Sequence, residues 1–321
     1  MIIAILTPIQ IEQAAIISQL HHTSEKIVDG NRYIFGKLDG LHHSFNIITQ
    51  QSGPKNEVTA IAAEKIIRIF QPIIVLLVGV AGGVKDVAIG DVVVGTKYYG
   101  YESGKENPEG FASRPDSGYY SKELLVCAEF VAAKNAWHQR TEKAKNSKVI
   151  FGAIASGNKV IAATDSATFR LLKQNYNDTT AVDMEAVGLG QVMRLYPSIR
   201  FLNIRGISDL LDHKSAADAS GSQELAAANM AAFVIELINQ IDISKFKITG
   251  MEIHELAKQI VELIIPIAKS ESTKEITGEV KAVTEGSMNQ LWEKVKPLFM
   301  EEYLALKKKP NDKDTRSPKN K

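Results

Sequence analysis

Residues 73–96, IIVLLVGVAGGVKDVAIGDVVVGT, contain two apolar runs on either side of a glycine-rich segment. A short continuous apolar run is typical of a strand that is buried on both faces of a sheet. The intervening VAGG, residues 80–83, predicts a turn at which the backbone can approach a ligand closely, because glycine has no side chain. This stretch therefore predicts a strand, a turn and a second strand in the core of the protein.

Similar apolar runs recur along the chain and alternate with helical patterns. Strands are expected at IIAIL (2–6), VIFGAIAS (149–156) and RFLNIRGIS (200–208), with helices between them. The alternation predicts an α/β fold with a parallel or mixed central sheet. Residues 97–120 are rich in glycine, proline, tyrosine and charge, and we expect a long loop that acts as a lid or a binding loop.

The composition excludes several classes of protein. A hydrophobic fraction of 45% in 321 residues is enough for a sizeable core, and a net charge of +1 gives no overall attraction to nucleic acid or to an anionic membrane. The single cysteine, Cys127, cannot form a disulfide framework or a thiolate metal cage, and the seven histidines lack metal-ligand spacing. No signal peptide or spanning apolar run is apparent, so we expect a soluble cytoplasmic protein with no metal and no cofactor.

The character of the sequence changes after residue 240. We predict four parts: a main domain at 1–240, a linker at 241–250, a helical module at 251–306 and a disordered tail at 307–321. The two amphipathic segments of the module are too short to form a large core of their own. We expect them to serve oligomerisation or partner docking, with Trp292 and Phe299 on the contact face; the alternative is a helical extension packed on its own domain.

Acidic residues follow three of the predicted strands. Glu12 comes after the first strand in TPIQIE, Glu185 lies in VDME, and Asp209 ends IRGISD. Ligands of α/β proteins bind at the carboxyl ends of the strands, so these positions can meet at one site. Any one of these residues alone could be a helix cap or a solvated side chain.

Five motifs together resemble a known family. They are AILTPIQIE (4–12), VGVAGGV with IGDVVV (78–94), ASGNKV (155–160), AVDMEA (181–186) and IRGISD (204–209). In this order and spacing they resemble the nucleoside phosphorylase and nucleosidase superfamily, and most closely its 5′-methylthioadenosine/S-adenosylhomocysteine nucleosidases. The resemblance covers the main domain and implies a three-layer fold with a mixed central sheet. It also implies a homo-oligomer.

The resemblance implies a role for each carboxylate. Breaking an N-glycosidic bond requires a proton for the leaving base, a nucleophile at the anomeric carbon and a hold on the ribose. Asp209 matches the general acid that protonates the purine, and Glu185 matches the carboxylate that binds the ribose hydroxyls. Glu12 matches the base that activates water, Met184 matches the residue that packs on the sugar, and Asp183 is expected to be structural.

The same resemblance favours water over phosphate as the nucleophile. The phosphorylases bind phosphate with glycine and arginine after the first strand, whereas TPIQIE contains neither and carries Glu12, which would repel phosphate. Val80, Ala81 and Gly82 are expected to line the substrate site, and Val80 stands where many relatives have a hydroxyl residue. The sequence therefore favours a hydrolase, with a phosphate-dependent phosphorylase as the alternative.

The substrate is less well defined by sequence. Val160 matches a position where the nucleosidases usually place an aromatic residue against adenine. Lys159 and Arg114, with the tyrosines of 97–120, could contact a phosphorylated 5′ end, or could be solvated surface charges.

The predicted activity is therefore hydrolysis of a purine nucleoside or nucleotide, with adenine as the expected base. No nucleic-acid or membrane partner is expected, and a protein partner would bind through the helical module. The alternative of another class is a nucleotide sensor that signals through the C-terminal helices, as in a bacterial defence system.

Overall fold

The computed structural model describes residues 1–108, 110–144, 146–211 and 221–246. The chain divides into two compact units, Met1–Lys245 and Phe246–Lys321. The first unit extends past the predicted boundary at residue 240, and Ile241 is fully buried in it. The predicted helical module and tail, with Trp292 and Phe299, lie outside the described residues.

Strands and helices alternate along the first unit. The strands are β1 (Ile2–Thr7), β2 (His21–Val28), β3 (Asn31–Asp39), β4 (Ser44–Gln51), β5 (Ile74–Gly83), β6 (Val92–Gly100), β7 (Gly104–Asn107), β8 (Gly110–Ser113), β9 (Asp116–Tyr119), β10 (Val149–Ser156), β11 (Thr179–Asp183) and β12 (Arg200–Asp209). The helices are α1 (Gln10–Ile17), α2 (Asn56–Phe70), α3 (Lys122–Lys134), α4 (Ala167–Asn175), α5 (Ala186–Met193) and α7 (Ser222–Gln240), with short 3-10 helices η1 (Ala136–Arg140), η2 (Glu142–Ala144) and η3 (Ile243–Lys245).

The strands form a mixed central sheet. Within the described residues its order is β11-β10-β6-β12-β5-β1-β4-β3-β2, with β9 added to β6. β1 runs parallel to both β4 and β5, and β5 runs parallel to β12, whereas β12 and β6 are antiparallel. β11 also pairs with β5, so that β5, β12, β6, β10 and β11 close on themselves.

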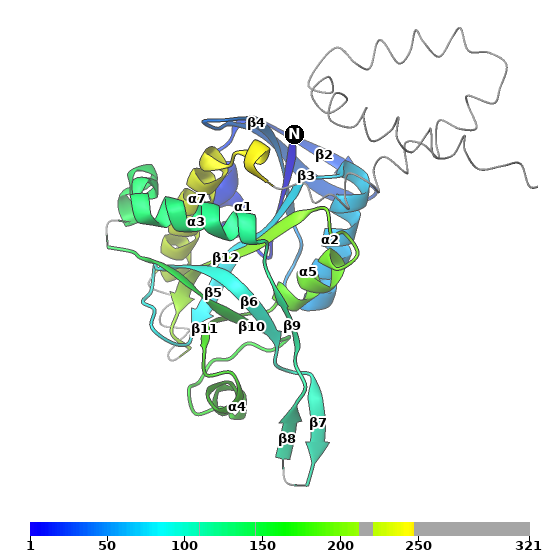
Figure 1. Cartoon of the computed structure of the whole chain (residues 1–321), viewed down its shortest axis with the longest axis vertical. Coiled ribbons are helices and arrows are strands. Elements are labelled where there is room, and N and C mark those ends of the chain that lie inside the picture. The colour runs from blue at the N-terminus through cyan, green and yellow to red at the C-terminus, as the bar shows by residue number, and fades with distance from the viewer. Residues whose placement is uncertain (109, 145, 212–220, 247–321) are drawn as a thin grey trace, which may run out of the picture. The chain divides into compact units, whose positions relative to one another are not determined.

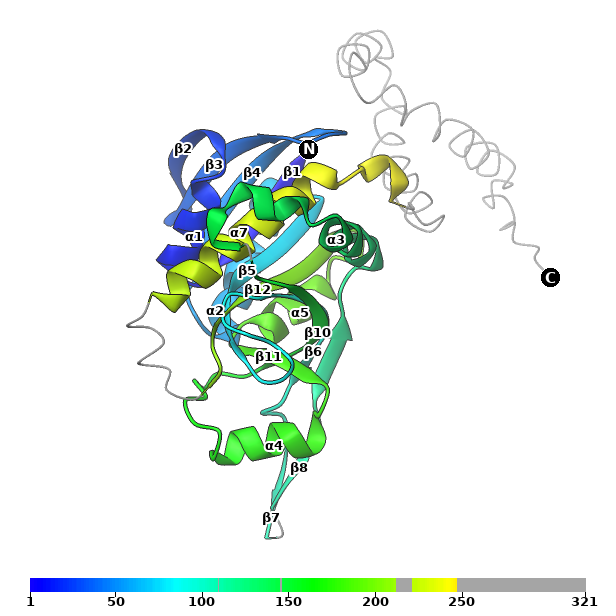
Figure 2. The same ribbon diagram turned by 90° about the vertical axis from the view of Figure 1, so that its left-hand side faces the viewer.

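Helices cover both faces of this sheet, which gives three layers (Figures 1 and 2). α2 and α5 pack on one face, and α1, α3 and α7 lie on the other. On the first face, alternate residues of β1 and β5 meet small and branched side chains of α2, namely Ala4, Leu6, Val75, Leu77, Ala62, Ala63, Ile66 and Ile67. Because successive strand residues point to opposite faces, the fully apolar strands supply both cores. The predicted α/β fold with a mixed sheet is confirmed.

The closure of the sheet brings three strand ends together. Gly82 near the end of β5 pairs with Asp209 at the end of β12, and on its other side with Val182 of β11. The carboxyl end of β1, at Thr7, lies one strand away, because β1 is the other neighbour of β5. The residues that follow these strands therefore gather at one edge of the sheet.

One expectation about local structure was wrong. Residues 97–120 are not a structureless loop: β6 continues to Gly100, β7 and β8 form a hairpin, and β9 pairs back on β6. The strand β2 follows α1 directly and was not predicted.

No helix in the described part of the chain is both long enough and apolar enough to span a membrane.

Candidate active site

A cavity of about 180 Å³ opens at the edge where the strand ends meet. Its walls come from the β1–α1 connection, the ends of β5 and β12, the segment after β10 and the β11–α5 connection. The lining residues are Pro8, Ile9, Glu12, Pro54, Val80, Ala81, Gly82, Lys159, Val160, Ile161, Val182, Asp183, Met184, Glu185, Ser208, Leu211 and Gln223. Eight of the ten predicted site residues are in this set, and Asp209 and Arg114 are not.

Glu12 is held at the cavity wall by two backbone donors. It lies in the first turn of α1, where its Oε2 accepts a hydrogen bond from the N–H of Ile9 at 2.8 Å. Its Oε1 accepts from the N–H of Val80, at the end of β5, at 2.7 Å. The side chain is nearly inaccessible, and this burial raises the pKa of Glu12 to about 7, although Arg205 and the two hydrogen bonds lower it. A carboxyl group with such a pKa can accept a proton near neutral pH.

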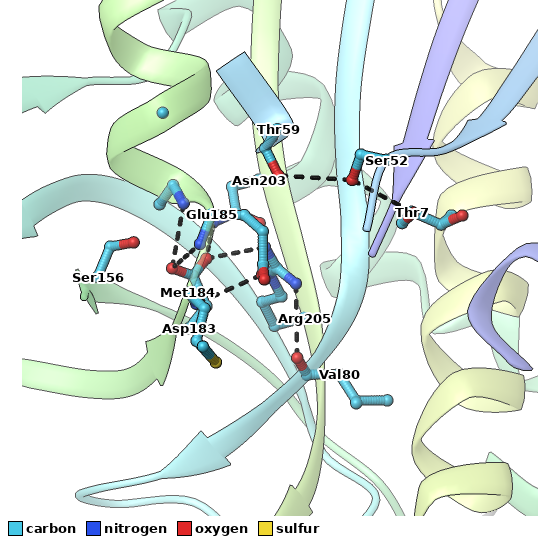
Figure 3. Close-up of polar contacts among 12 residues, drawn as sticks. Thr7, Ser52, Thr59, Val80, Ser156, Asp183, Met184, Glu185, Asn203 and Arg205 are labelled. Carbon is cyan, nitrogen blue, oxygen red and sulfur yellow. Dashed lines mark hydrogen bonds and ion pairs between the residues drawn. The ribbon is translucent and has the colours of Figure 1, made fainter. Parts of the chain in front are cut away.

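Asp183, Glu185 and Arg205 form a buried charge cluster beside the cavity (Figure 3). Arg205 Nη2 lies 2.9 Å from Asp183 Oδ2 and 3.1 Å from Glu185 Oε2. Arg205 Nε donates to Asn203 Oδ1 at 2.8 Å, and Asn203 Nδ2 donates to Asp183 Oδ2 at 2.8 Å. The guanidinium is fully buried, so these partners compensate the loss of its hydration.

The two acidic residues of the β11–α5 connection have different surroundings. Asp183 Oδ1 accepts from the N–H groups of Glu185 at 3.2 Å and Ala186 at 3.1 Å, and so holds the start of α5. Glu185 accepts from the N–H of Lys55 at 3.2 Å and from that of Met184 at 3.3 Å. Burial raises the pKa of Glu185 and Asp183 raises it further, whereas Arg205 lowers it. Both side chains line the cavity, and Asp183 also holds the start of α5.

Asp209 lies behind the cavity wall. Its side chain is fully buried; Oδ2 accepts from the Ser208 hydroxyl at 3.0 Å and Oδ1 accepts from the N–H of Leu211 at 3.1 Å. Ser208 and Leu211 both line the cavity, and Gly82 is the strand partner of Asp209. Asp209 is therefore one residue removed from the open space.

The segment after β10 forms the more exposed wall. Val160 lines the cavity but is 60% exposed, and Ile161 beside it is buried. Lys159 also lines the cavity; its Nζ lies 3.3 Å from Glu102 Oε1. Arg114 is an exposed residue of the β8–β9 connection, away from the lining residues.

The sequence reasoning missed Arg205. The sequence could have indicated it, since a charged residue inside the largely apolar strand RFLNIRGIS is unusual unless it forms an ion pair. Ile9, Pro54, Ile161 and Gln223 were also missed, because nothing in the local pattern distinguishes them from scaffold residues. In the described part of the chain, no cluster of three or more histidine, cysteine or acidic side chains is arranged to hold a metal ion.

Comparison with known proteins identifies the family. Residues 2–239 match the family model described as the phosphorylase superfamily. The chain belongs to this superfamily. The match spans β1 to the last turn of α7 and includes every lining residue of the cavity.

Several of the similar curated proteins carry the same name. The 5′-methylthioadenosine/S-adenosylhomocysteine nucleosidase of Haemophilus influenzae is 29% identical over 218 residues, which cover 64% of this chain and 85% of that protein. The enzyme of the same name from Shewanella piezotolerans is 26% identical over 249 residues, covering 74% of this chain and 99% of that protein. The resemblance predicted from the sequence motifs is confirmed.

Solved structures share the fold. The nucleosidase of the same name from Neisseria meningitidis, in complex with methylthio-immucillin-A, superposes with a TM-score of 0.63 at 22% identity, over 75% of this chain and 99% of that chain. The futalosine hydrolase of Helicobacter pylori superposes with a TM-score of 0.62 at 22% identity, over 75% of this chain and 98% of that chain. At this identity the likeness establishes the fold alone.

Proposed function

We propose that this protein hydrolyses the N-glycosidic bond of a purine nucleoside or nucleotide and releases the free base, with adenine as the preferred base. The observation that carries the proposal is the pair of buried carboxylates, Glu12 and Glu185, on the wall of one cavity next to Arg205. The similar curated proteins are named as nucleosidases of adenine nucleosides, and these names support hydrolysis of an N-glycosidic bond.

The two carboxylates suit different parts of this reaction. An oxocarbenium-like transition state places positive charge on the sugar, and a carboxylate close to the ribose stabilises that charge. Glu185 is suited to this role, because it can accept hydrogen bonds from the ribose hydroxyls while Arg205 and two N–H groups hold it. Glu12 is suited to deprotonate a water molecule, since its pKa of about 7 allows proton transfer at neutral pH.

The leaving base needs a proton, and Asp209 is the proposed donor. It is buried and pairs with Gly82, which lines the cavity, as do its contacts Ser208 and Leu211. Ser208 and Leu211 each contact one of its carboxyl oxygens, and a carboxyl oxygen can take part in a second hydrogen bond, here with the purine ring. Met184, between Asp183 and Glu185, is proposed to pack on the sugar.

The lining of the cavity favours water over phosphate. Among the described lining residues the one cation is Lys159, and its ammonium group is paired with Glu102. Phosphate binding normally uses several cationic or N–H donors, whereas the Val80 N–H here is occupied by Glu12. The pairing of Lys159 also weakens the case for a phosphorylated 5′ end.

A product assay tests the proposal. The full-length protein is incubated with 5′-methylthioadenosine, S-adenosylhomocysteine, adenosine and adenosine monophosphate, and the products are separated by chromatography. Free adenine with a sugar that carries a hydroxyl group and no phosphate at C1 is the expected result, and Glu185→Gln should remove it. Tight binding of one compound without any turnover would support the nucleotide sensor and overturn the hydrolase.

A further inference from the structure

The backbone of Lys55 adopts a conformation that residues other than glycine rarely take. Its φ is 92° and its ψ is 149°. A side chain at such angles collides with its own backbone, so the conformation costs free energy and persists only where the surroundings impose it. Lys55 immediately follows Pro54, which lines the cavity, and immediately precedes α2. Strain of this kind is concentrated at functional sites.

The strained residue directs its N–H toward the site. The N–H of Lys55 donates to Glu185 Oε1 at 3.2 Å. The other oxygen, Oε2, is held from a different side, by Arg205 at 3.1 Å and by the Met184 N–H at 3.3 Å. Lys55 therefore contributes to the orientation of the carboxylate, because it contacts Oε1 while the other two groups contact Oε2.

Asn56 fixes the strained turn in place. Its backbone N–H and its Nδ2 both donate to Asn158 Oδ1, each at 3.1 Å. Its Oδ1 accepts from the Gly188 N–H at 2.9 Å and from the Ser156 hydroxyl at 3.1 Å. A Cβ added at Gly188 would lie 1.9 Å from the Asn56 carbonyl oxygen, so glycine is required for this close approach. The start of α2 is thus tied to α5, to the end of β10 and to the segment that follows β10.

We propose that Lys55 and Asn56 act as positioning residues for Glu185. The contacts of Asn56 hold Lys55 in its strained conformation, and that conformation aims the Lys55 N–H at the carboxylate. The inference rests on the proposed role of Glu185 in binding the ribose. It adds that the geometry of this carboxylate is set from outside the cavity, through a residue that does not line it.

The test uses the strain itself. Asn56→Ala removes the side-chain anchors and lets Lys55 relax, so kcat/KM should fall by roughly 10–100-fold, the range expected for misplacing a catalytic group by about 1 Å. Both kcat and KM should change, because Glu185 is proposed to hold the ribose in the bound substrate and to stabilise its positive charge further in the transition state. Glycine adopts the angles of Lys55 without strain and keeps the N–H. Adding Lys55→Gly to Asn56→Ala should therefore recover most of the lost activity.

Gln71 supplies a matched control. It lies at the other end of α2 with φ 47° and ψ 56°, also a conformation that favours glycine, and it has no contact with Glu185 among the interactions of the described residues. Gln71→Gly relieves strain in the same helix, but it should not restore the activity of Asn56→Ala. Lys55→Ala, which removes the ammonium but keeps Cβ, should not restore it either.

The outcomes separate this inference from the proposed function. Near wild-type kcat/KM for Asn56→Ala, no recovery with Lys55→Gly, or equal recovery with Gln71→Gly would each overturn the positioning role. If Asn56→Ala does not fold, Ser156→Ala removes one anchor and carries the same test, with rescue by Lys55→Gly again required. Full turnover by Glu185→Gln would instead contradict the proposed role of Glu185.

Discussion

Replacing Glu12 by glutamine should change how the stability of the protein depends on pH. The carboxyl group of Glu12 is buried, and its pKa lies at about 7 against an ordinary value of 4.5. The folded state therefore holds a proton on Glu12 over a pH range in which the unfolded chain has lost it. Glutamine has nearly the same shape and does not ionise, so Glu12→Gln removes this linkage.

The size of the effect follows from the two pKa values. At about 1.4 kcal/mol per pKa unit, the difference between 4.5 and about 7 corresponds to roughly 3 kcal/mol of unfolding free energy. A carboxyl group with a raised folded pKa contributes stability that is complete below the unfolded value and is lost as the pH rises through the folded value. Between pH 5 and pH 8, the wild type should lose roughly 2–3 kcal/mol relative to Glu12→Gln.

Urea unfolding at pH 5, 6, 7 and 8 measures this difference. The free energy of unfolding is extrapolated to water for both proteins at each pH. Replacing the Glu12 carboxyl group, which accepts two N–H groups, also changes the free energy of unfolding by an amount that does not depend on pH. This amount cancels when only the change in unfolding free energy with pH is compared between the two proteins. If the free energy of unfolding changes equally with pH in the two proteins, burial does not raise the pKa of Glu12. Glu12 would then not be suited to act as the base.

Four further results are expected. Asp209→Asn should lower turnover by roughly 10²–10⁴-fold with a much smaller effect on binding, measured by steady-state kinetics and calorimetry; near wild-type turnover would exclude Asp209 as the acid. The kcat/KM of the wild type should rise with pH through about 7, because Glu12 must be ionised to accept a proton, and a flat profile from pH 5 to 8 would exclude it as the base. Light scattering should show a homo-oligomer at micromolar concentration, and a monodisperse monomer would contradict this. If residues 251–306 serve assembly, truncation after Lys245, where the first unit ends, should change the oligomeric state. An unchanged size after truncation would contradict a role of these residues in assembly.

The central strands were predictable because strands that are buried in a sheet consist largely of apolar residues. VIFGAIAS coincides with β10, and RFLNIRGIS covers all of β12 except its last residue, Asp209. Both runs are largely apolar and become buried in the sheet. β2 was missed because nearly all of its residues are exposed, so its sequence carries no alternation to detect. The β7–β8 hairpin is similarly exposed, and its glycine and charge indicated a loop.

The candidate site was predictable where a motif carries the chemistry. Glu12 and Glu185 follow strand ends, and the structure places both on one cavity wall. The contacts that orient them join residues far apart in the sequence, such as Asn56 with Gly188 and Lys55 with Glu185. Nothing in SGPKN indicates a positive φ at Lys55, because the contacts that hold the neighbouring Asn56 come from residues far away in the sequence.

The dependence of base release on phosphate distinguishes hydrolysis from phosphorolysis. Adenine release from 5′-methylthioadenosine is measured in phosphate-free buffer and at increasing phosphate concentration, and the sugar product is identified by mass spectrometry. The proposed function predicts full turnover without phosphate, an unchanged rate when phosphate is added, and a free hydroxyl at C1 of the sugar. A rate that requires phosphate, with a sugar 1-phosphate as the product, would contradict it.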